Sequence, residues 1–177
     1  VPKHIDYPEI PLSDLLKNTA KSNPNHAAIG YFDTEMTSRE LNTACDKFAT
    51  ALADLGVKKG DKVATILPNC PQFIVSDYAI MRLGAVHVPI SILHAAPDLL
   101  YEIGESGAET VICSYVRLER VNSIKDKTKL KNIIFTHVPI FPDYSVPEIK
   151  EAPSAHRLED LIEKYEPKPP KVEINPT

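Results

Sequence analysis

The sequence contains no tryptophan, and among its 177 residues only three are cysteines and six are glycines. The cysteines, Cys45, Cys70 and Cys113, are scattered and form no CxxC pair, so they indicate neither a disulfide framework nor a zinc site. Unpaired thiols of this kind are typical of a reducing compartment. We therefore predict a cytoplasmic protein.

Long apolar runs and an excess of positive charge are also missing. No run approaches the ~18 apolar residues of a membrane-spanning helix, and no signal-peptide pattern opens the chain. Lysine and arginine total 20 against 24 aspartates and glutamates, which gives a net charge of −4. Nucleic-acid binding depends on a broad positive surface. We predict no nucleic-acid partner and no membrane span.

The residues that are present are those of an ordinary globular protein. The chain is 43% hydrophobic and 25% charged, and its length suits one domain. All six glycines lie at or before Gly107, whereas eight of the sixteen prolines lie at or after Pro139. We predict an α/β subdomain over residues 1–136, followed over residues 137–177 by a proline-rich connection that contains one helix.

The best-defined helix of the sequence begins at Ser38. Thr37 and Glu40 have the spacing of a capping box, in which each side chain bonds a backbone N–H group at the start of a helix. Apolar residues then recur at helical spacing up to Leu55. Gly56 can adopt the left-handed conformation that ends a helix.

Two further helices carry specific expectations. The first begins near Pro11, and one helical face is expected to bury Leu12, Leu15, Leu16 and Ala20. The second has Pro71 in its first turn, with Asn69 expected as its cap and Gln72 expected to reach back to the helix start.

Short apolar runs alternate with the helices along the chain. They cover residues 63–67, 85–90, 110–113 and 133–135, and their composition suits strands buried on both faces. Strand and helix alternation predicts right-handed crossovers, and therefore an α/β fold with a doubly wound, mostly parallel sheet and helices on both faces. A hairpin over residues 27–36 is expected to add antiparallel edge strands, and residues 172–174 resemble the start of another strand.

Complete catalytic motifs are absent from the sequence. It has no GxGxxG, Walker loop, HExxH or nucleophile elbow, and its six histidines lack the spacing of metal ligands. We predict no catalytic residue and no metal site within this chain, and we interpret the histidines as ordinary packing or surface residues.

Five segments nevertheless occur in a specific order and spacing. They are residues 37–41 (TSREL), 59–64 (KGDKVA), 67–69 (LPN), 82–90 (RLGAVHVPI) and 105–108 (ESGA). Together they resemble the AMP-forming adenylating enzymes, the superfamily that contains acyl-CoA synthetases, firefly luciferase and peptide-synthetase adenylation domains. The resemblance covers residues 7–177 and favours the acid–CoA ligase branch.

The resemblance implies a function for a longer protein. Members of this branch activate a carboxylic acid with ATP and Mg²⁺ to an acyl-adenylate and transfer the acyl group to CoA, and a long- or medium-chain fatty acid is the implied acid. The family's Ser/Thr/Gly-rich phosphate loop would follow Thr177, so the chain resembles an amino-terminal fragment in which residues 137–177 lead to the rest of the large domain. The fragment is expected to be inactive alone and to bind none of these cofactors tightly.

The resemblance also implies contacts to CoA. In related acetyl-CoA synthetases, the loop after the Gly-Ala-Val-His strand and arginines after the next strand approach the nucleotide portion of CoA. The matching residues here are Ser91, His94, Arg117 and Arg120. An arginine fork suits the 3′-phosphate, but ordinary surface arginines on an amphipathic helix are the alternative interpretation.

Two further points concern apolar side chains, one of them a departure from the acetyl enzymes. The chain has Ile92-Leu93 where the acetyl enzymes have a glycine pair, so the loop backbone is less free to approach a ligand. Phe73 and Ile74 suit either the wall of an acyl tunnel or ordinary core packing.

A different class of function is open at this point. The chain could be a stand-alone binding or dimerisation module without catalysis. A reading frame that continues past Thr177 into a Ser/Thr/Gly-rich loop favours the enzyme, and a stop codon there favours the module. An unrelated Rossmann-like nucleotide binder is disfavoured because no glycine-rich loop follows a strand.

Overall fold

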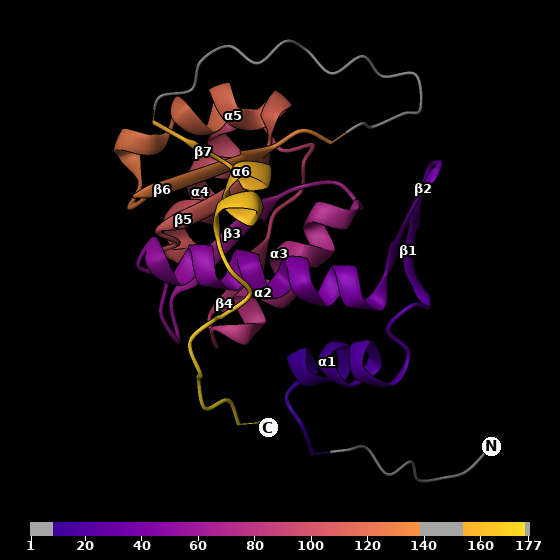
Figure 1. The fold of residues 1–177 in the computed structure, drawn as a ribbon. Helices are drawn as coiled ribbons and strands as arrows, with labels where there is room; N and C mark the ends of the chain where they lie inside the picture. Colours follow the sequence, from indigo (N-terminus) through magenta and orange to yellow (C-terminus); the bar gives the residue numbers. More distant parts are fainter. Residues whose placement is uncertain (1–8, 139–153, 176–177) are drawn as a thin grey trace, which may run out of the picture.

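The computed structural model describes residues 9–138 and 154–175 (Figure 1). The helices are α1 (Leu12–Ser22), α2 (Ser38–Asp54), α3 (Pro71–Arg82), α4 (Ala96–Ser106), α5 (Tyr115–Asn122) and α6 (Leu158–Lys164), with a 3-10 turn at Lys125–Lys127. The strands are β1 (Ala27–Tyr31), β2 (Thr34–Thr37), β3 (Lys62–Ile66), β4 (Val86–Pro89), β5 (Thr110–Ser114), β6 (Asn132–Thr136) and β7 (His156–Arg157).

The main sheet has five strands in the order β4-β3-β5-β6-β7, and every neighbouring pair is parallel. Helices cover both of its faces, so the predicted doubly wound α/β fold is confirmed. The predicted hairpin also forms, from β1 and β2. Its expected attachment to the main sheet is wrong, because the hairpin is a separate two-stranded sheet.

Two hydrophobic cores lie on opposite faces of the main sheet. Alternate residues of the same strand enter different cores: Val63 of β3 packs with α2, α3 and α6, whereas Ala64 packs with α4 and α5. In β5, all five residues are buried, as expected for a parallel strand covered on both faces. The sheet is therefore an internal layer between two sets of helices.

The capping box at the start of α2 is confirmed. The backbone N–H of Glu40 donates to Thr37 Oγ1 at 3.3 Å, and the backbone N–H of Thr37 donates to Glu40 Oε2 at 2.8 Å. Thr37 Oγ1 also donates to Glu40 Oε2 at 2.7 Å, and the two bonds that the carboxylate accepts from Thr37 lower the pKa of Glu40 because they stabilise its charged form. The cap fixes the point where hairpin strand β2 turns into α2.

The prediction that α1 buries Leu12 and Leu15 is wrong. In α1, Leu12 is 58% exposed and Leu15 is 40% exposed, while Leu16 and Ser13 are buried. The reason is that α1 lies at the periphery of the molecule (Figure 1) and contacts α2 and α3 on one side.

The start of α3 also differs from the expectation. Its N-cap residue is Cys70, which makes no side-chain capping bond, so Asn69 is not the cap. Pro71 at the first helical position needs no N–H partner and has the required φ angle. The side chain of Gln72 does not reach back to the helix start but donates to the backbone oxygen of His137 at 3.3 Å.

The described part of the carboxyl-terminal region packs on the sheet. Strand β7 pairs with β6, and α6 packs against α2, which confirms the predicted late helix. Residues 172–174 form no strand and run instead as an irregular segment, in which the backbone oxygen of Glu173 accepts a bond of 2.6 Å from Lys59 Nζ. Residues 139–153 lie outside the described residues, and the division at residue 136 stays a prediction.

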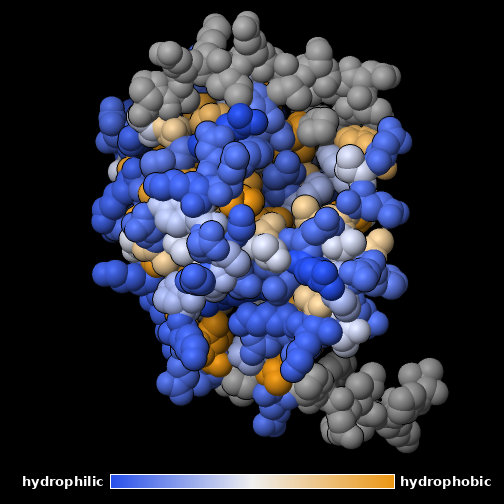
Figure 2. All heavy atoms as spheres, in the orientation of Figure 1, coloured by the Kyte–Doolittle hydropathy of each residue, from blue (hydrophilic) through white to orange (hydrophobic). Residues whose placement is uncertain are grey.

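The visible surface is mainly hydrophilic. Figure 2 shows charged and polar residues over most of the face in view, with apolar atoms in small separate patches. Within residues 9–138 and 154–175, no helix combines the length and the apolar character needed to cross a membrane.

Gly84 provides a test of the packing between α3 and the carboxyl-terminal segment. Its φ is +63°, and an added Cβ would lie 3.0 Å from Lys59 Cγ and 3.3 Å from Val172 Cγ1. We expect Gly84→Ala to lower the free energy of unfolding by about 1–2 kcal/mol, because both the conformation and the contacts oppose a side chain. Urea unfolding measures the change.

Gly104→Ala is the matched control. Gly104 lies inside α4 with no atom within 4 Å of an added Cβ, so alanine should raise the free energy of unfolding by about 0.5–1 kcal/mol. Equal effects of the two substitutions would contradict the packing described for Gly84.

Candidate functional site

The candidate site lies at the carboxyl edge of the main sheet. Parallel strands place their carboxyl ends at the same edge, and ligands of doubly wound sheets bind where the strand order reverses. Here the chain passes from β3 outward to β4 and then crosses back to β5 on the other side of β3. The switch point is therefore between β3 and β5, with α3 and α5 starting beside it on opposite faces.

The segment after β4 is a closed turn at this edge. The backbone N–H of His94 donates to the backbone oxygen of Ser91 at 3.2 Å, and Ser91 Oγ accepts from the backbone N–H of Leu93 at 3.3 Å. The ring of His94 is held by Glu102 of α4, with 2.8 Å between Nδ1 and Oε2. We call residues 91–94 the β4 turn.

Arg120 connects the β4 turn to α5. Its Nη1 group donates to the backbone oxygen of His94 at 2.8 Å. The structure therefore brings together three of the four residues that the resemblance implied, namely Ser91, His94 and Arg120. One of the guanidinium N–H groups of Arg120 is already used to position the turn.

Arg117 lies one helical turn before Arg120 on α5. Its Nε atom is buried and has no hydrogen-bond partner. An unsatisfied buried donor costs free energy, and a ligand anion would satisfy it. Arg117 is therefore suited to a contact with a phosphate group.

The two apolar residues of the β4 turn, Ile92 and Leu93, have different environments. Ile92 packs against the core formed with α4 and α5, whereas Leu93 is 81% exposed. An exposed leucine stands where the acetyl enzymes, as implied by the resemblance, have glycine. A ligand that approaches this turn would meet the Leu93 side chain before the backbone.

The sequence analysis did not identify a pair of polar side chains, Gln72 and His137, at the carboxyl edge of the sheet. Gln72 Oε1 and His137 Nε2 are both buried without a hydrogen-bond partner, and Gln72 Nε2 bonds the backbone of His137. The ring of His137 lies 4.6 Å from that of Tyr115, centroid to centroid. The sequence contains one signal for this site, namely that His137 directly follows the buried strand β6 at its carboxyl end.

Burial sets the protonation of His137. Loss of solvent lowers its pKa below the usual 6.5; Glu159 opposes this shift and Arg157 adds to it. The folded state therefore binds fewer protons than the unfolded state between the lowered pKa and about 6.5. The contribution of neutral His137 to the free energy of unfolding is complete above this pH window and is lost as the pH falls through it.

We expect His137→Asn to flatten the decline in stability below about pH 6.5. Urea unfolding at several pH values gives the free energies to compare. His26→Asn is the control, because His26 is exposed. An equally flattened profile in the control, or an unchanged profile in His137→Asn, would contradict the assigned role of burial.

An apolar cavity of 370 Å³ adjoins the start of α3. The hairpin strand β1 forms one wall and α3 the other; the lining includes Ile29, Tyr31, Asn69, Cys70, Phe73 and Ile74. Phe73 and Ile74 also pack against the core that contains α2. The core-packing interpretation of these residues is confirmed, and the acyl-tunnel interpretation stays a prediction.

Metal ligands do not gather in the part of the chain that is described. Within it, no group of three or more His, Cys, Asp or Glu residues is placed to hold a metal ion. The arginines at the carboxyl edge are suited to binding an anion.

Comparison with known proteins agrees with this fold. The fold matches a crystal structure of the anthranilate CoA ligase AuaEII in complex with anthranoyl-AMP, with a TM-score of 0.81 at 22% identity over 96% of this chain and 31% of that chain. A Mycobacterium tuberculosis fatty acyl CoA synthetase gives a TM-score of 0.74 at 26% identity, covering 92% of this chain and 30% of that one. The molecule therefore has the α/β fold found within larger ligases.

The family follows from the sequence comparison. The model of the AMP-binding enzyme family matches residues 16–175, and the chain belongs to that family. A long-chain-fatty-acid–CoA ligase of Bacillus subtilis (strain 168) is 27% identical over 138 residues, which are 78% of this chain and 25% of that protein. The chain thus spans about a quarter of this relative's length.

Proposed function

We propose that the chain is the amino-terminal part of an AMP-forming ligase that joins a long- or medium-chain fatty acid to CoA. Its support is the family match over residues 16–175 together with the names of the relatives, which include long-chain-fatty-acid–CoA ligases of Bacillus subtilis and Escherichia coli. The reaction would consume ATP, the acid and CoA and would give acyl-CoA, AMP and pyrophosphate.

The chain's own contribution is structural and ligand-binding. ATP with Mg²⁺ would supply the activation of the acid, but the described residues include no cluster of metal ligands and the sequence has no glycine-rich phosphate loop. We assign no catalytic residue to this chain. It forms one side of the substrate channel, and activity requires the remainder of a longer protein.

The observation that supports the CoA contact within this proposal is the arginine pair on α5 beside the β4 turn. Arg120 holds the turn through the His94 backbone, and Arg117 has a buried Nε donor without a partner. A phosphate of CoA is a chemically suitable acceptor, because charge-assisted hydrogen bonds from arginine to phosphate are strong. In this proposal Arg117 binds CoA, and Ser91, His94 and Arg120 shape the wall beside it.

The acyl chain is assigned to the other side of the switch point. The 370 Å³ cavity between β1 and α3 is lined by apolar side chains, including Phe73 and Ile74. Burial of an alkyl chain is favourable in proportion to the apolar area removed from water. This cavity is the part of the chain that suits a fatty acid.

The three thiols fit the proposed cytoplasmic location. All are free and buried, and burial raises the pKa of Cys45 and of Cys113 to about 12. Protonated buried thiols are poor nucleophiles. They behave as small apolar side chains of the core.

Arg117→Ala in a longer polypeptide that contains this chain tests the CoA assignment. We expect KM for CoA to rise about tenfold, because one charge-assisted bond is lost, while acid-dependent pyrophosphate release stays within about twofold. Arg39→Ala is the control, since Arg39 is exposed on α2, which covers the opposite face of the sheet from α5. Equal losses in thioester formation and in pyrophosphate release would contradict the assignment.

A second experiment tests whether the chain alone lacks catalytic activity. The purified 177-residue chain should release no pyrophosphate when ATP, Mg²⁺ and a fatty acid are supplied together. A coupled pyrophosphate assay gives the rate, with the longer polypeptide as the positive control. Acid-dependent release by the chain alone would show that it carries catalytic groups that we have not assigned.

A further inference from the structure

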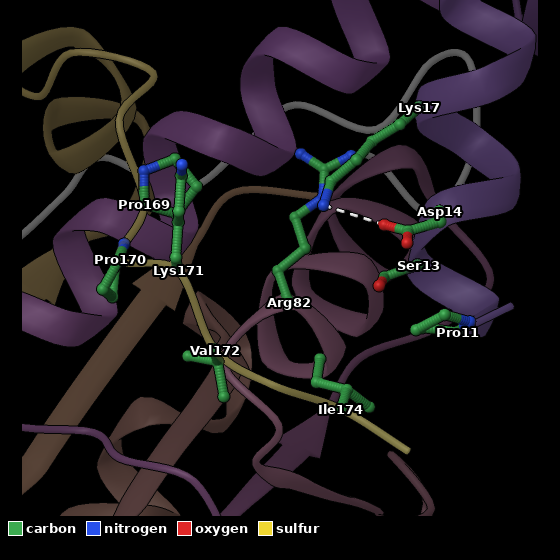
Figure 3. Close-up of a pocket in the computed structure, with 10 residues that line it drawn as sticks. All are labelled: Pro11, Ser13, Asp14, Lys17, Arg82, Pro169, Pro170, Lys171, Val172 and Ile174. Atoms are coloured by element: carbon green, nitrogen blue, oxygen red, sulfur yellow. Dashed lines mark hydrogen bonds and ion pairs between the residues drawn. The ribbon is translucent and has the colours of Figure 1, made fainter. Parts of the chain in front are cut away.

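A second cavity lies at the opposite end of α3 from the candidate site. It has a volume of 330 Å³ and is enclosed by the start of α1, the end of α3 and the segment of residues 169–174 (Figure 3). Its polar lining consists of Ser13, Asp14, Lys17, Arg82 and Lys171. None of these residues belongs to the carboxyl edge of the sheet, so this cavity is independent of the proposed CoA contacts.

Arg82 presents one unsatisfied donor at this cavity. Its side chain is only 1% exposed, and its Nη1 and Nη2 groups are bonded to α2: Nη1 to Asp46 at 2.6 Å and Nη2 to Asn42 Oδ1 at 2.7 Å. Nε is buried without a partner. In Figure 3 the Arg82 side chain extends from α3 towards Lys17. The arginine is therefore held by three hydrogen bonds to α2, and its Nε–H group has no partner.

The charge of the cavity wall favours an anion. Asp46 already balances Arg82, and Asp14 is paired with Lys17 at 2.9 Å. Lys171 adds a positive charge from the carboxyl-terminal segment, so the wall carries one excess positive charge. Lys171 is exposed, and a bound anion would neutralise this excess charge.

The geometry of the donors distinguishes between anions. Carboxylates are recognised best by the bidentate fork of a guanidinium group, but the terminal nitrogens of Arg82 are turned towards Asn42 and Asp46. The remaining donors are single groups on three different elements: Arg82 Nε, the Lys17 ammonium and the Lys171 ammonium. Separate donors from several directions match the spread oxygens of a tetrahedral phosphate group.

We propose that this cavity is a binding site for a phosphate group, held by Arg82 Nε, Lys17 and Lys171. The ligand would connect the segment of residues 169–174 to α1 and α3. That segment already contacts the same region, because Val172 lies beside Gly84 and the Glu173 backbone bonds Lys59. Phosphate binding therefore fixes the position of the carboxyl-terminal segment against α3.

The Arg82 Nε–H resonance of the 177-residue chain is a direct readout. Inorganic phosphate is added at constant ionic strength, with chloride as the reference anion, while heteronuclear NMR follows this resonance. We expect a saturable shift with phosphate at millimolar concentrations and none with chloride. The proposal would be overturned if neither phosphate nor AMP shifted the resonance, or if chloride shifted it equally.

Matched lysine variants separate the site from general charge effects. Lys171→Ala should weaken the affinity for phosphate about two- to fivefold, as loss of an exposed ionic contact implies. Lys168→Ala removes the same charge just before this segment, but Lys168 does not line the cavity and should leave the affinity unchanged. Equal weakening by both variants would contradict the site.

AMP is the second ligand arm of the titration. A saturable shift with both ligands supports recognition of the phosphate group in either form, and a shift with AMP alone identifies a phosphomonoester as the ligand. A shift with inorganic phosphate alone identifies the free ion. In each case the readout is local to Arg82 and does not depend on ligase activity.

Discussion

The parallel pairing of β3 with β4 and with β5 is the constraint on which the rest of the molecule depends. Parallel strands need crossover connections, and right-handed crossovers place α3 on one face of the sheet and α4 on the other. The same pairing collects the carboxyl ends of all five strands at one edge. A ligand site at that edge is thus a consequence of the topology, and the helices supply its walls.

The two ends of α3 serve different purposes in this account. At its start, Gln72 contacts the backbone after β6, and the neighbouring residues line an apolar cavity. At its end, Arg82 is anchored to α2 and Gly84 leaves room for the carboxyl-terminal segment. One rigid helix therefore separates the proposed substrate wall from the proposed phosphate site, and a change at one end need not disturb the other.

Local signals in the sequence predicted most of the fold. The capping box at Thr37, the buried runs of β3 and β5 and the alternation of strand and helix depend on neighbours in the chain, and all are confirmed. The exposure of Leu12 and the separate hairpin sheet depend on which elements meet in space, and periodicity does not encode that. The contact of Arg120 with the β4 turn joins residues 26 positions apart. Family resemblance suggested both partners, but only the structure shows their bond, and Gln72 with His137 had no signal beyond position.

The most direct test of the central claim is to map where CoA contacts the chain. Backbone amide NMR spectra of the 177-residue protein, recorded with increasing CoA up to millimolar concentrations, identify the affected residues. Our account predicts shifts concentrated in the β4 turn and in the first two turns of α5, with the amino edge around Asp61 unchanged. Shifts centred on the amino edge, or none near Arg117, would contradict the claim that the carboxyl edge of this sheet is the ligand-binding face.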